Sequence, residues 1–221
     1  MRLRSAISTA ILSIGCGLSL QAATVYNEAV QGDLSNSGLS PTQITVAAGS
    51  NQIIGTTGQG ANGLDRDYFT VTVPSGLQLT SLMELAGTTV GGAVSFIGLQ
   101  SGNQVTVATN AANATGLLGW SHYGGVTTDT DLFTTMSVPT QGSTGFTRPL
   151  NVGNYSFWVQ DFNTGTFSYS FDLVLAPAAS PVPEPKSYAM MLAGFMALIF
   201  LYKRHQRSLY KSFTAAEQLS V

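Results

Sequence analysis

Residues 166–173 alternate polar and large apolar side chains, and Val174 and Leu175 follow. On a β-strand neighbouring side chains point to opposite faces. One face of this strand would therefore carry five large apolar residues: Phe167, Tyr169, Phe171, Leu173 and Leu175. A shift by one residue would expose all of them, so we expect the register to be well defined. The pattern predicts a buried strand, joined to a strand at 154–160 in a hairpin around 161–165.

Shorter stretches with strand-like composition or alternation occupy much of the preceding chain. They lie at 43–46, 51–54, 68–73, 77–80, 93–100 and 104–107. Turn-forming residues separate them, and residues 24–175 show neither a helical period nor an internal repeat. This pattern predicts an all-β fold in which residues 24–175 form a single β-sandwich or jelly-roll domain.

Several segments of this region resemble one known family. They read LDRDYFTVTVPSGLQL (64–79), SFIGLQSG (95–102), PLNVGNYSFWVQD (149–161) and FSYSFDLVL (167–175). They are similar to the bacterial pre-peptidase C-terminal type of β-sandwich, which pairs an Asp-x-Asp-Tyr-Phe strand with a late Gly-x-Tyr-x-Phe strand. The resemblance implies a fold and does not by itself imply an activity.

The first 23 residues have the three-part layout of a secretory signal peptide. Arg2 and Arg4 precede an apolar run at 6–20, and small residues follow up to Ala23. We predict a signal peptide at 1–23 and export of the rest of the chain. A retained membrane anchor and lipidation of Cys16 are the alternatives. Cys16 is the one cysteine of the chain, so the exported body would contain no disulfide.

Between residues 24 and 181 the chain is acidic. This region has two basic residues, Arg66 and Arg148, and nine carboxylates, which gives a formal net charge of 2 − 9 = −7. A negative surface repels phosphate backbones, so the composition argues against nucleic-acid binding. An acidic, lysine-free body rich in Ser and Thr suits a hydrated polysaccharide matrix, and its hydroxyls are candidate acceptors for glycans.

The end of the chain has three parts in a fixed order. A short linker at 176–181 leads to Val182-Pro183-Glu184-Pro185, in which two prolines hold the backbone extended. Residues 188–202 are all apolar, aromatic or Gly, and as a helix they would rise about 22 Å. A basic cluster then occupies 203–207.

This apolar segment predicts a single transmembrane helix at 186–202 in the precursor. The span is marginal against a hydrocarbon core of about 30 Å, and Lys186 would extend toward the interface. The basic residues would form a stop on the cytoplasmic side, and 208–221 a cytoplasmic tail.

The order of motif, apolar helix and basic cluster resembles the PEP-CTERM protein-sorting signal. In that family the signal marks exported proteins of Gram-negative bacteria for an exosortase, a membrane cysteine peptidase that processes them near the motif. The resemblance implies that 182–207 is a sorting signal. Val182, Pro183, Glu184 and Pro185 match the recognition motif, and Lys203, Arg204 and Arg207 match the basic stop. The mixed basic cluster and the long tail after it depart from the family's pattern.

Together these features predict an exported, non-enzymatic protein with an exosortase as partner. The chain would cross the inner membrane and be held there transiently. It would then pass to the cell surface or to the extracellular matrix of exopolysaccharide that surrounds a biofilm. The alternative interpretation of the tail is a plain single-span anchor in which Pro-Glu-Pro is accidental.

The body offers few groups for catalysis. Its one histidine, His122, lies in the aromatic loop 119–125, and it has neither cysteine nor lysine. Ser121 precedes this histidine, but Tyr123 stands where a nucleophile elbow has its last glycine. We expect a solvent-facing His122, and we rank a secreted hydrolase behind the other functions.

Two carboxylate pairs are candidates for calcium, the only cofactor that the sequence suggests. Asp65 and Asp67 are spaced two residues apart, as are Asp129 and Asp131. On a strand both members of a pair point the same way, and in a loop they can share a calcium ion with backbone carbonyls. The Asp65–Asp67 pair is the stronger candidate. The alternative for both pairs is that they cap turns at strand ends.

Trp158 falls on the opposite face of its strand from Tyr155, Phe157 and Val159. An outward Trp beside polar neighbours is typical of a platform on which a sugar ring stacks. With Trp120 and Tyr123 nearby, the chain would be a carbohydrate-binding module for a surface glycan. The alternative is that a loop or a second sheet covers Trp158.

Overall fold

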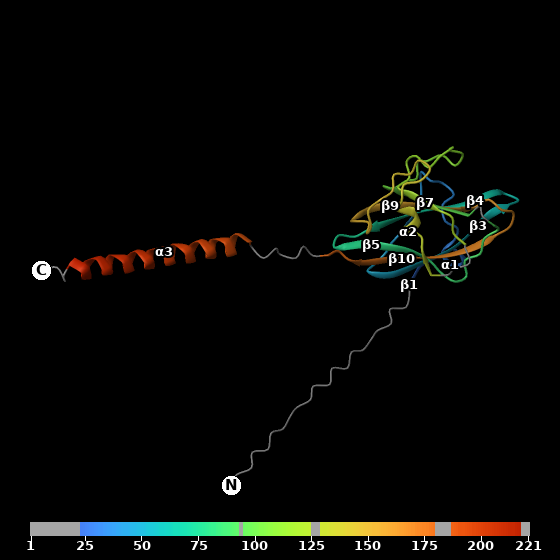
Figure 1. The fold of residues 1–221 in the computed structure, drawn as a ribbon. Helices are drawn as coiled ribbons and strands as arrows, with labels where there is room; N and C mark the ends of the chain where they lie inside the picture. The colour runs from blue at the N-terminus through green and yellow to red at the C-terminus, as the bar shows by residue number, and fades with distance from the viewer. Residues whose placement is uncertain (1–22, 93–94, 125–128, 180–186, 218–221) are drawn as a thin grey trace, which may run out of the picture. The chain divides into compact units, whose positions relative to one another are not determined.

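A computed structural model describes residues 23–92, 95–124, 129–179 and 187–217 of the chain. The chain divides into two compact units, Met1–Ala178 and Ala179–Val221. The first unit holds the strands, and the second holds one long helix (Figure 1). Residues 1–22 of the predicted signal peptide and the predicted sorting motif at 182–185 lie outside the described residues.

The described part of the first unit is built from ten strands and two helices of a single turn. The strands are β1 (Ala23–Asn27), β2 (Thr42–Ile44), β3 (Gly49–Gly60), β4 (Gly63–Val73), β5 (Leu77–Glu84), β6 (Ser95–Ser101), β7 (Gly119–Ser121), β8 (Thr130–Asp131), β9 (Gly153–Asp161) and β10 (Phe167–Pro177). The helices are α1 (Glu28–Gln31) and α2 (Phe133–Met136). The prediction of an all-β body is confirmed at this level.

The strands form one curled sheet in the order β7-β6-β9-β4-β3-β10-β5-β8. Neighbours along this path pair antiparallel, whereas β1 and β2 add to β3 and β4 in parallel. The end of β3 pairs with the start of β4, from Gly58–Asp65 to Gly60–Gly63, and this hairpin links two layers. Figure 1 shows β9, β4 and β7 in one layer and β5, β10 and β1 in the other.

The predicted hairpin between 154–160 and 166–175 is wrong in its pairing. Both strands exist, as β9 and β10. However, β9 pairs with β4 and β6, while β10 pairs with β3 and β5, so both edges of each strand are occupied by other strands. The apolar faces of β9 and β10 therefore belong to opposite layers. Two apolar faces that lie opposite one another are buried more completely than two that lie side by side in one layer.

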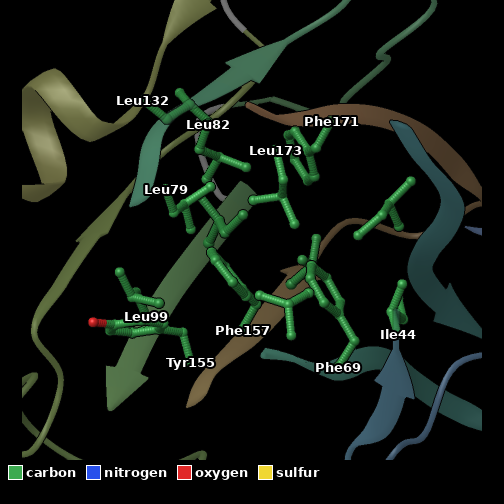
Figure 2. Packing of buried hydrophobic residues seen from close by; sticks show 14 of the residues in the cluster. Ile44, Phe69, Leu79, Leu82, Leu99, Leu132, Tyr155, Phe157, Phe171 and Leu173 are labelled. Atoms are coloured by element: carbon green, nitrogen blue, oxygen red, sulfur yellow. The ribbon is translucent and has the colours of Figure 1, made fainter. Parts of the chain in front are cut away.

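The core lies between these layers. The alternating sequence of β10 supplies apolar side chains to one side of it. Phe171 and Leu173 of β10 are fully buried, in one cluster with Phe157 of β9 and Phe69 of β4. The rings of Phe69 and Phe157 stack with their centroids 5.0 Å apart. Figure 2 shows these four side chains pointing into one space from both layers.

A second, smaller apolar cluster lies on the outer face of β4 and β9. Its buried members are Tyr68, Val105, Leu117 and Trp158. Residues 104–107, predicted as a strand, are not one: Val105 donates its N–H to the carbonyl of Gly38, and the segment crosses the sheet face. This segment covers the outer face of β4, so β4 is buried on both faces at Thr70. The sequence of β4 had predicted a strand buried on one face only.

Two predicted boundaries also need correction. β2 ends at Ile44, so it covers only the first part of the strand predicted at 43–46. β10 extends to Pro177, two residues into the segment 176–181 that was predicted as a linker.

The second unit contains the helix α3 (Ser187–Glu217). The helix runs through the predicted transmembrane segment 186–202 from Ser187 on, and continues beyond it through the basic cluster and most of the predicted tail. Its described apolar side chains, among them Met190, Phe195 and Phe200, are exposed. None of the described helices combines the length and the apolar character that crossing a bilayer requires.

Phe157→Ala tests the importance of the contact across the core. We expect it to lower the free energy of unfolding by about 3–5 kcal/mol, because a fully buried ring is lost and a cavity remains. Val152→Ala, at a side chain that is 63% exposed, should change it by less than about 0.5 kcal/mol. Urea unfolding of the full chain in mild detergent measures both, and equal effects would contradict the packing described here.

Candidate functional site

The outer face of β6, β7 and β9 carries a cluster of aromatic rings. Phe96 of β6 stacks on Trp120 of β7 with centroids 5.8 Å apart, and it meets Trp158 of β9 edge-on at 4.8 Å. The ring of His122 is edge-on to Trp120 at 5.4 Å. The three rings of Phe96, Trp120 and Trp158 share one face because Gly98, two residues after Phe96, is paired with both Trp120 and Trp158.

Trp158 is on the predicted face, but it is not an exposed platform. Its side chain is 4% exposed beneath the segment that carries Val105 and Leu117, and its Nε1 donates to Oε1 of Gln160 at 3.1 Å. The alternative, a Trp covered by a loop, is therefore confirmed. The sequence pattern reports the face of a strand, and it contains no information on what a distant segment lays over that face.

Tyr123 is also not part of an exposed platform. It is 4% exposed and belongs to the main core between the layers, where its ring is edge-on to Phe171 at 5.2 Å. Burial raises its pKa well above its usual range. Of the three residues predicted for the platform, Trp120 alone remains partly exposed.

A cavity of about 350 Å³ opens beside these rings. Its wall includes the aromatic residues Phe96, Trp120, Trp158 and Phe162 and the polar residues Asn113, His122, Gln141 and Gln160. The indole Nε1 of Trp120 is buried and has no hydrogen-bond partner. Ring faces next to amide groups form a surface that can stack on a small polar ring and hydrogen-bond it. The sequence analysis did not single out Phe96 or Phe162 as candidates for binding.

His122 is exposed, as expected, and its neighbours do not form a nucleophile–base pair with it. The hydroxyl of Ser121 donates to the backbone carbonyl of His122 at 2.9 Å, rather than to its ring. The ring Nδ1 lies against the carbonyl of Ser95. Activation of a serine needs a base at the hydroxyl proton, and this geometry does not supply it.

A cluster of carboxylates lies at the core-facing side of β4. One carboxylate oxygen each of Glu28, Asp33 and Asp67 lies within 4.8 Å of the other two. Asp67 therefore meets two residues of the N-terminal segment, and Asp65, its partner in the predicted pair, does not belong to this group. Asp65 instead lines an open cavity with Arg66, and Asp33 also lies in the wall of this cavity.

The carboxylate of Glu28 is held in place by backbone donors. Glu28 is the first residue of α1, whose N-cap Asn27 accepts from the N–H of Ala29. Its Oε1 accepts from the N–H of Leu34 at 3.1 Å, and its Oε2 accepts from the N–H of Thr56 in β3 at 2.7 Å. Burial raises the pKa of this carboxyl, and the bonds from Leu34 and Thr56 oppose that rise.

Asp67 is fully buried, and one of its oxygens has no partner. Its Oδ2 accepts a hydrogen bond from the hydroxyl of Tyr169 in β10 at 2.7 Å, whereas its Oδ1 has none. Burial, followed by the charge of Glu28, raises the pKa of this carboxyl to about 9. The bond from Tyr169 opposes that rise. An unpaired, buried carboxylate oxygen lowers the stability of the fold, because it has lost its hydrogen bonds to water and has gained none within the protein.

Gly55 of β3 allows Tyr169 and Glu28 to lie close to the backbone of that strand. A Cβ built at this position would lie 2.4 Å from the hydroxyl oxygen of Tyr169 and 3.0 Å from the carboxyl carbon of Glu28. Any larger residue would displace one of them. The close approach of strand backbone and site therefore depends on glycine.

The other buried carboxylates of the described body each accept at least one hydrogen bond. Asp161 accepts from Gly91 and Asn163, Asp172 from Ser50 and Asn51, and Glu84 from Gly124. In the second predicted calcium pair, Asp131 is bonded within the protein as well. Asp131 forms an ion pair with Arg148 and accepts from the N–H groups of Leu82 and Phe133, which is the capping role that was the alternative. Asp129 is exposed.

The two remaining residues of the cluster were missed by the sequence analysis. Glu28 and Asp33 are about forty residues from Asp67 in the chain and belong to no motif. Only the pairing of β1 with β3 and the fold of α1 against β3 bring them beside β4.

The predicted sorting residues are only partly described. Val182, Pro183, Glu184 and Pro185 lie outside the described residues. Lys203 and Arg204 are exposed on α3, and Arg207 lies in the same helix.

Comparisons with models of protein families, with curated proteins and with solved structures find no match to this chain. Neither of the two family resemblances receives support from them. What the chain can do must therefore follow from its tail and from the two sites described above.

Glu84→Gln tests the energetic cost of a buried carboxylate. Burial raises the pKa of Glu84 above its unfolded value of about 4.3, against the opposing bond from Gly124. The folded state then binds the proton more tightly, so this residue's contribution to stability is largest below pH 4 and is lost as the pH rises through the folded pKa. Gln keeps the acceptor and has no proton to lose. The melting temperature of the variant, relative to wild type, should rise between pH 4 and 7. A difference independent of pH would refute this assignment.

Proposed function

We propose that this chain is an exported, non-enzymatic protein of the cell surface or extracellular matrix. In this proposal 1–23 is a signal peptide, and 182–207 is a PEP-CTERM-type signal that an exosortase recognises and processes. The body is a β-sandwich-type domain that works outside the inner membrane, in association with exopolysaccharide. The precursor is held transiently in the membrane by the apolar segment of its tail.

The division of the chain into two units is the observation that carries this proposal. Both apolar clusters are formed by residues between Tyr26 and Leu175, and every described strand ends by Pro177. Cleavage within 182–185 would therefore remove no member of these clusters and no described strand. A tail that is dispensable for the core is what a removable sorting signal requires.

The character of the tail supports a membrane-bound precursor. Large apolar side chains are exposed on α3 from Met190 to Tyr202, and they are not confined to one stripe. A helix that is apolar all round is stable in a lipid environment and not in water. The exposed Lys203 and Arg204 directly follow this apolar segment, and their positive charge suits the negatively charged surface of the cytoplasmic leaflet.

The C-terminus of the protein from its native host tests this proposal. We expect mass spectrometry of surface and culture-fluid fractions to find a C-terminal peptide ending at or near 182–185. Glu184→Gln should leave the precursor uncleaved in the membrane fraction, whereas Glu217→Gln, in the tail beyond the motif, should be processed normally. An intact chain reaching Val221 in the surface fraction would refute sorting by cleavage.

The aromatic pocket favours a second function, binding of a carbohydrate. Phe96 and Trp120 are partly exposed at a cavity of about 350 Å³, and Asn113 and Gln141 supply amide groups to its wall. The ring of Trp120 can stack on a sugar, although its Nε1–H is buried without a partner. The acidic body disfavours anionic polysaccharides, so the ligand we propose is a neutral sugar.

Trp120→Ala tests this function on affinity gels that contain neutral polysaccharides. We expect about two- to twelvefold weaker retention, because an aromatic stacking contact is worth roughly 0.5–1.5 kcal/mol. Trp120→Phe should lie between Trp120→Ala and wild type, since it keeps a smaller aromatic ring. Val152→Ala is the control, and melting curves confirm that each variant is folded. Equal retention of all four proteins on every gel would argue against a glycan site here.

A further inference from the structure

The carboxylate cluster of Glu28, Asp33 and Asp67 has a geometry that matches a hard divalent cation. Two oxygens bound to the same Ca²⁺ lie about 2.4 Å from it, so they are separated by at most about 4.8 Å. The three carboxylate oxygens of the cluster are already within 4.8 Å of one another. Mg²⁺ demands a near-ideal octahedron, whereas Ca²⁺ accepts an irregular shell of oxygens, so a cluster that is buried on one side and exposed on the other suits Ca²⁺ better.

An acidic cluster alone would not indicate a ligand, and the state of Asp67 is the independent observation. This side chain is fully buried and its Oδ1 lacks a partner, whereas no other carboxylate oxygen of the described residues is buried without one. Its Oδ2 is fixed by Tyr169, which leaves Oδ1 as the free ligand atom of the residue. A bound cation would satisfy this oxygen.

The charge around the cluster is not balanced by the chain itself. The charged groups that act on Asp67 are the carboxylates Glu28, Asp65 and Asp33, and each of them raises its pKa. The body has two cationic side chains, and both are engaged elsewhere. Arg66 donates to Gln160 at 3.1 Å, and Arg148 pairs with Asp131. A cation from solution is the remaining source of positive charge.

We propose that Glu28, Asp33 and Asp67 form a Ca²⁺-binding site. Asp33 is exposed and gives the ion access from solvent, while the buried Asp67 and the half-buried Glu28 form the inner side. Ca²⁺ takes six to eight oxygen ligands, so water completes the shell on the exposed side. The site is independent of the sugar pocket and of the sorting signal.

The expected consequence is a calcium-dependent attachment of the N-terminal segment to the sheet. Glu28 begins α1 and Asp33 follows its end, whereas Asp67 belongs to β4 and is held by Tyr169 of β10. One ion would therefore cross-link the N-terminal segment to β4. Extracellular calcium modules bind in the range of about 10⁻⁴–10⁻³ M, and this is the affinity we expect for a site with one fully exposed ligand.

The test is thermal unfolding of the full chain in mild detergent, first with EDTA and then with increasing CaCl₂. We expect the melting temperature to rise by roughly 5–10 °C at a hundredfold excess over the dissociation constant. A titration by calorimetry should give one site. No rise up to 10 mM CaCl₂, or the same rise with NaCl of equal ionic strength, would overturn the proposal.

Three variants locate the ion. Asp67→Asn should fold at least as well as wild type in EDTA, because the amide needs no counter-charge, and it should lose the response to CaCl₂. Asp33→Asn, on the surface, should weaken binding of Ca²⁺ at least about tenfold and should leave the melting temperature in EDTA unchanged. Asp65→Asn is the matched control, with the same loss of charge two residues away, and should keep the response. A response that survives in Asp67→Asn, or that Asp65→Asn abolishes, would overturn the assignment.

Discussion

The packing of β9 against β10 across one core is the contact on which the rest of the structure depends. Phe157 on one strand and Phe171 on the other belong to the same buried cluster, although the strands are not paired with each other. Each strand is instead flanked on both edges by others, so every apolar side chain on its inner face contributes to a shared interior. Because hydrophobic burial is the dominant favourable term in folding, this arrangement determines which strands can be neighbours.

Both candidate sites are consequences of this two-layer packing. The inner face of β4 bears Phe69 in the core and, two residues earlier, Asp67, where the apolar interior meets the N-terminal segment. The outer face of β9 and β6 is free of the core and is covered by the segment that contains Val105. The uncovered remainder of that face is the aromatic pocket. A carboxylate thus becomes buried because its strand is central, and an aromatic pocket forms because the cover is incomplete.

The sequence allowed much of the strand content to be predicted, but not the pairing. Alternation placed Phe171 and Leu173 on a buried face and Trp158 on the opposite face from Phe157, and both assignments agree with the structure. It failed where the answer depended on a distant segment. The hairpin of β9 and β10 was predicted from proximity in the chain, and the polar neighbours of Trp158 left its exposure open as one of two alternatives. Neither inference could include the residues that occupy the strand edges or cover the ring.

The sequence by itself determined the β-rich character of the body, the faces of its main strands, its acidity and the separate composition of its tail. These properties follow from local chemistry, namely side-chain alternation, turn residues and the count of charges. Only the tertiary structure brought Glu28 and Asp33 to Asp67, buried Tyr123 in the core and left Nε1 of Trp120 without a partner. Such placements depend on contacts between residues far apart in the chain, and no local pattern records them, because their energy comes from packing that exists only once the sheet has curled.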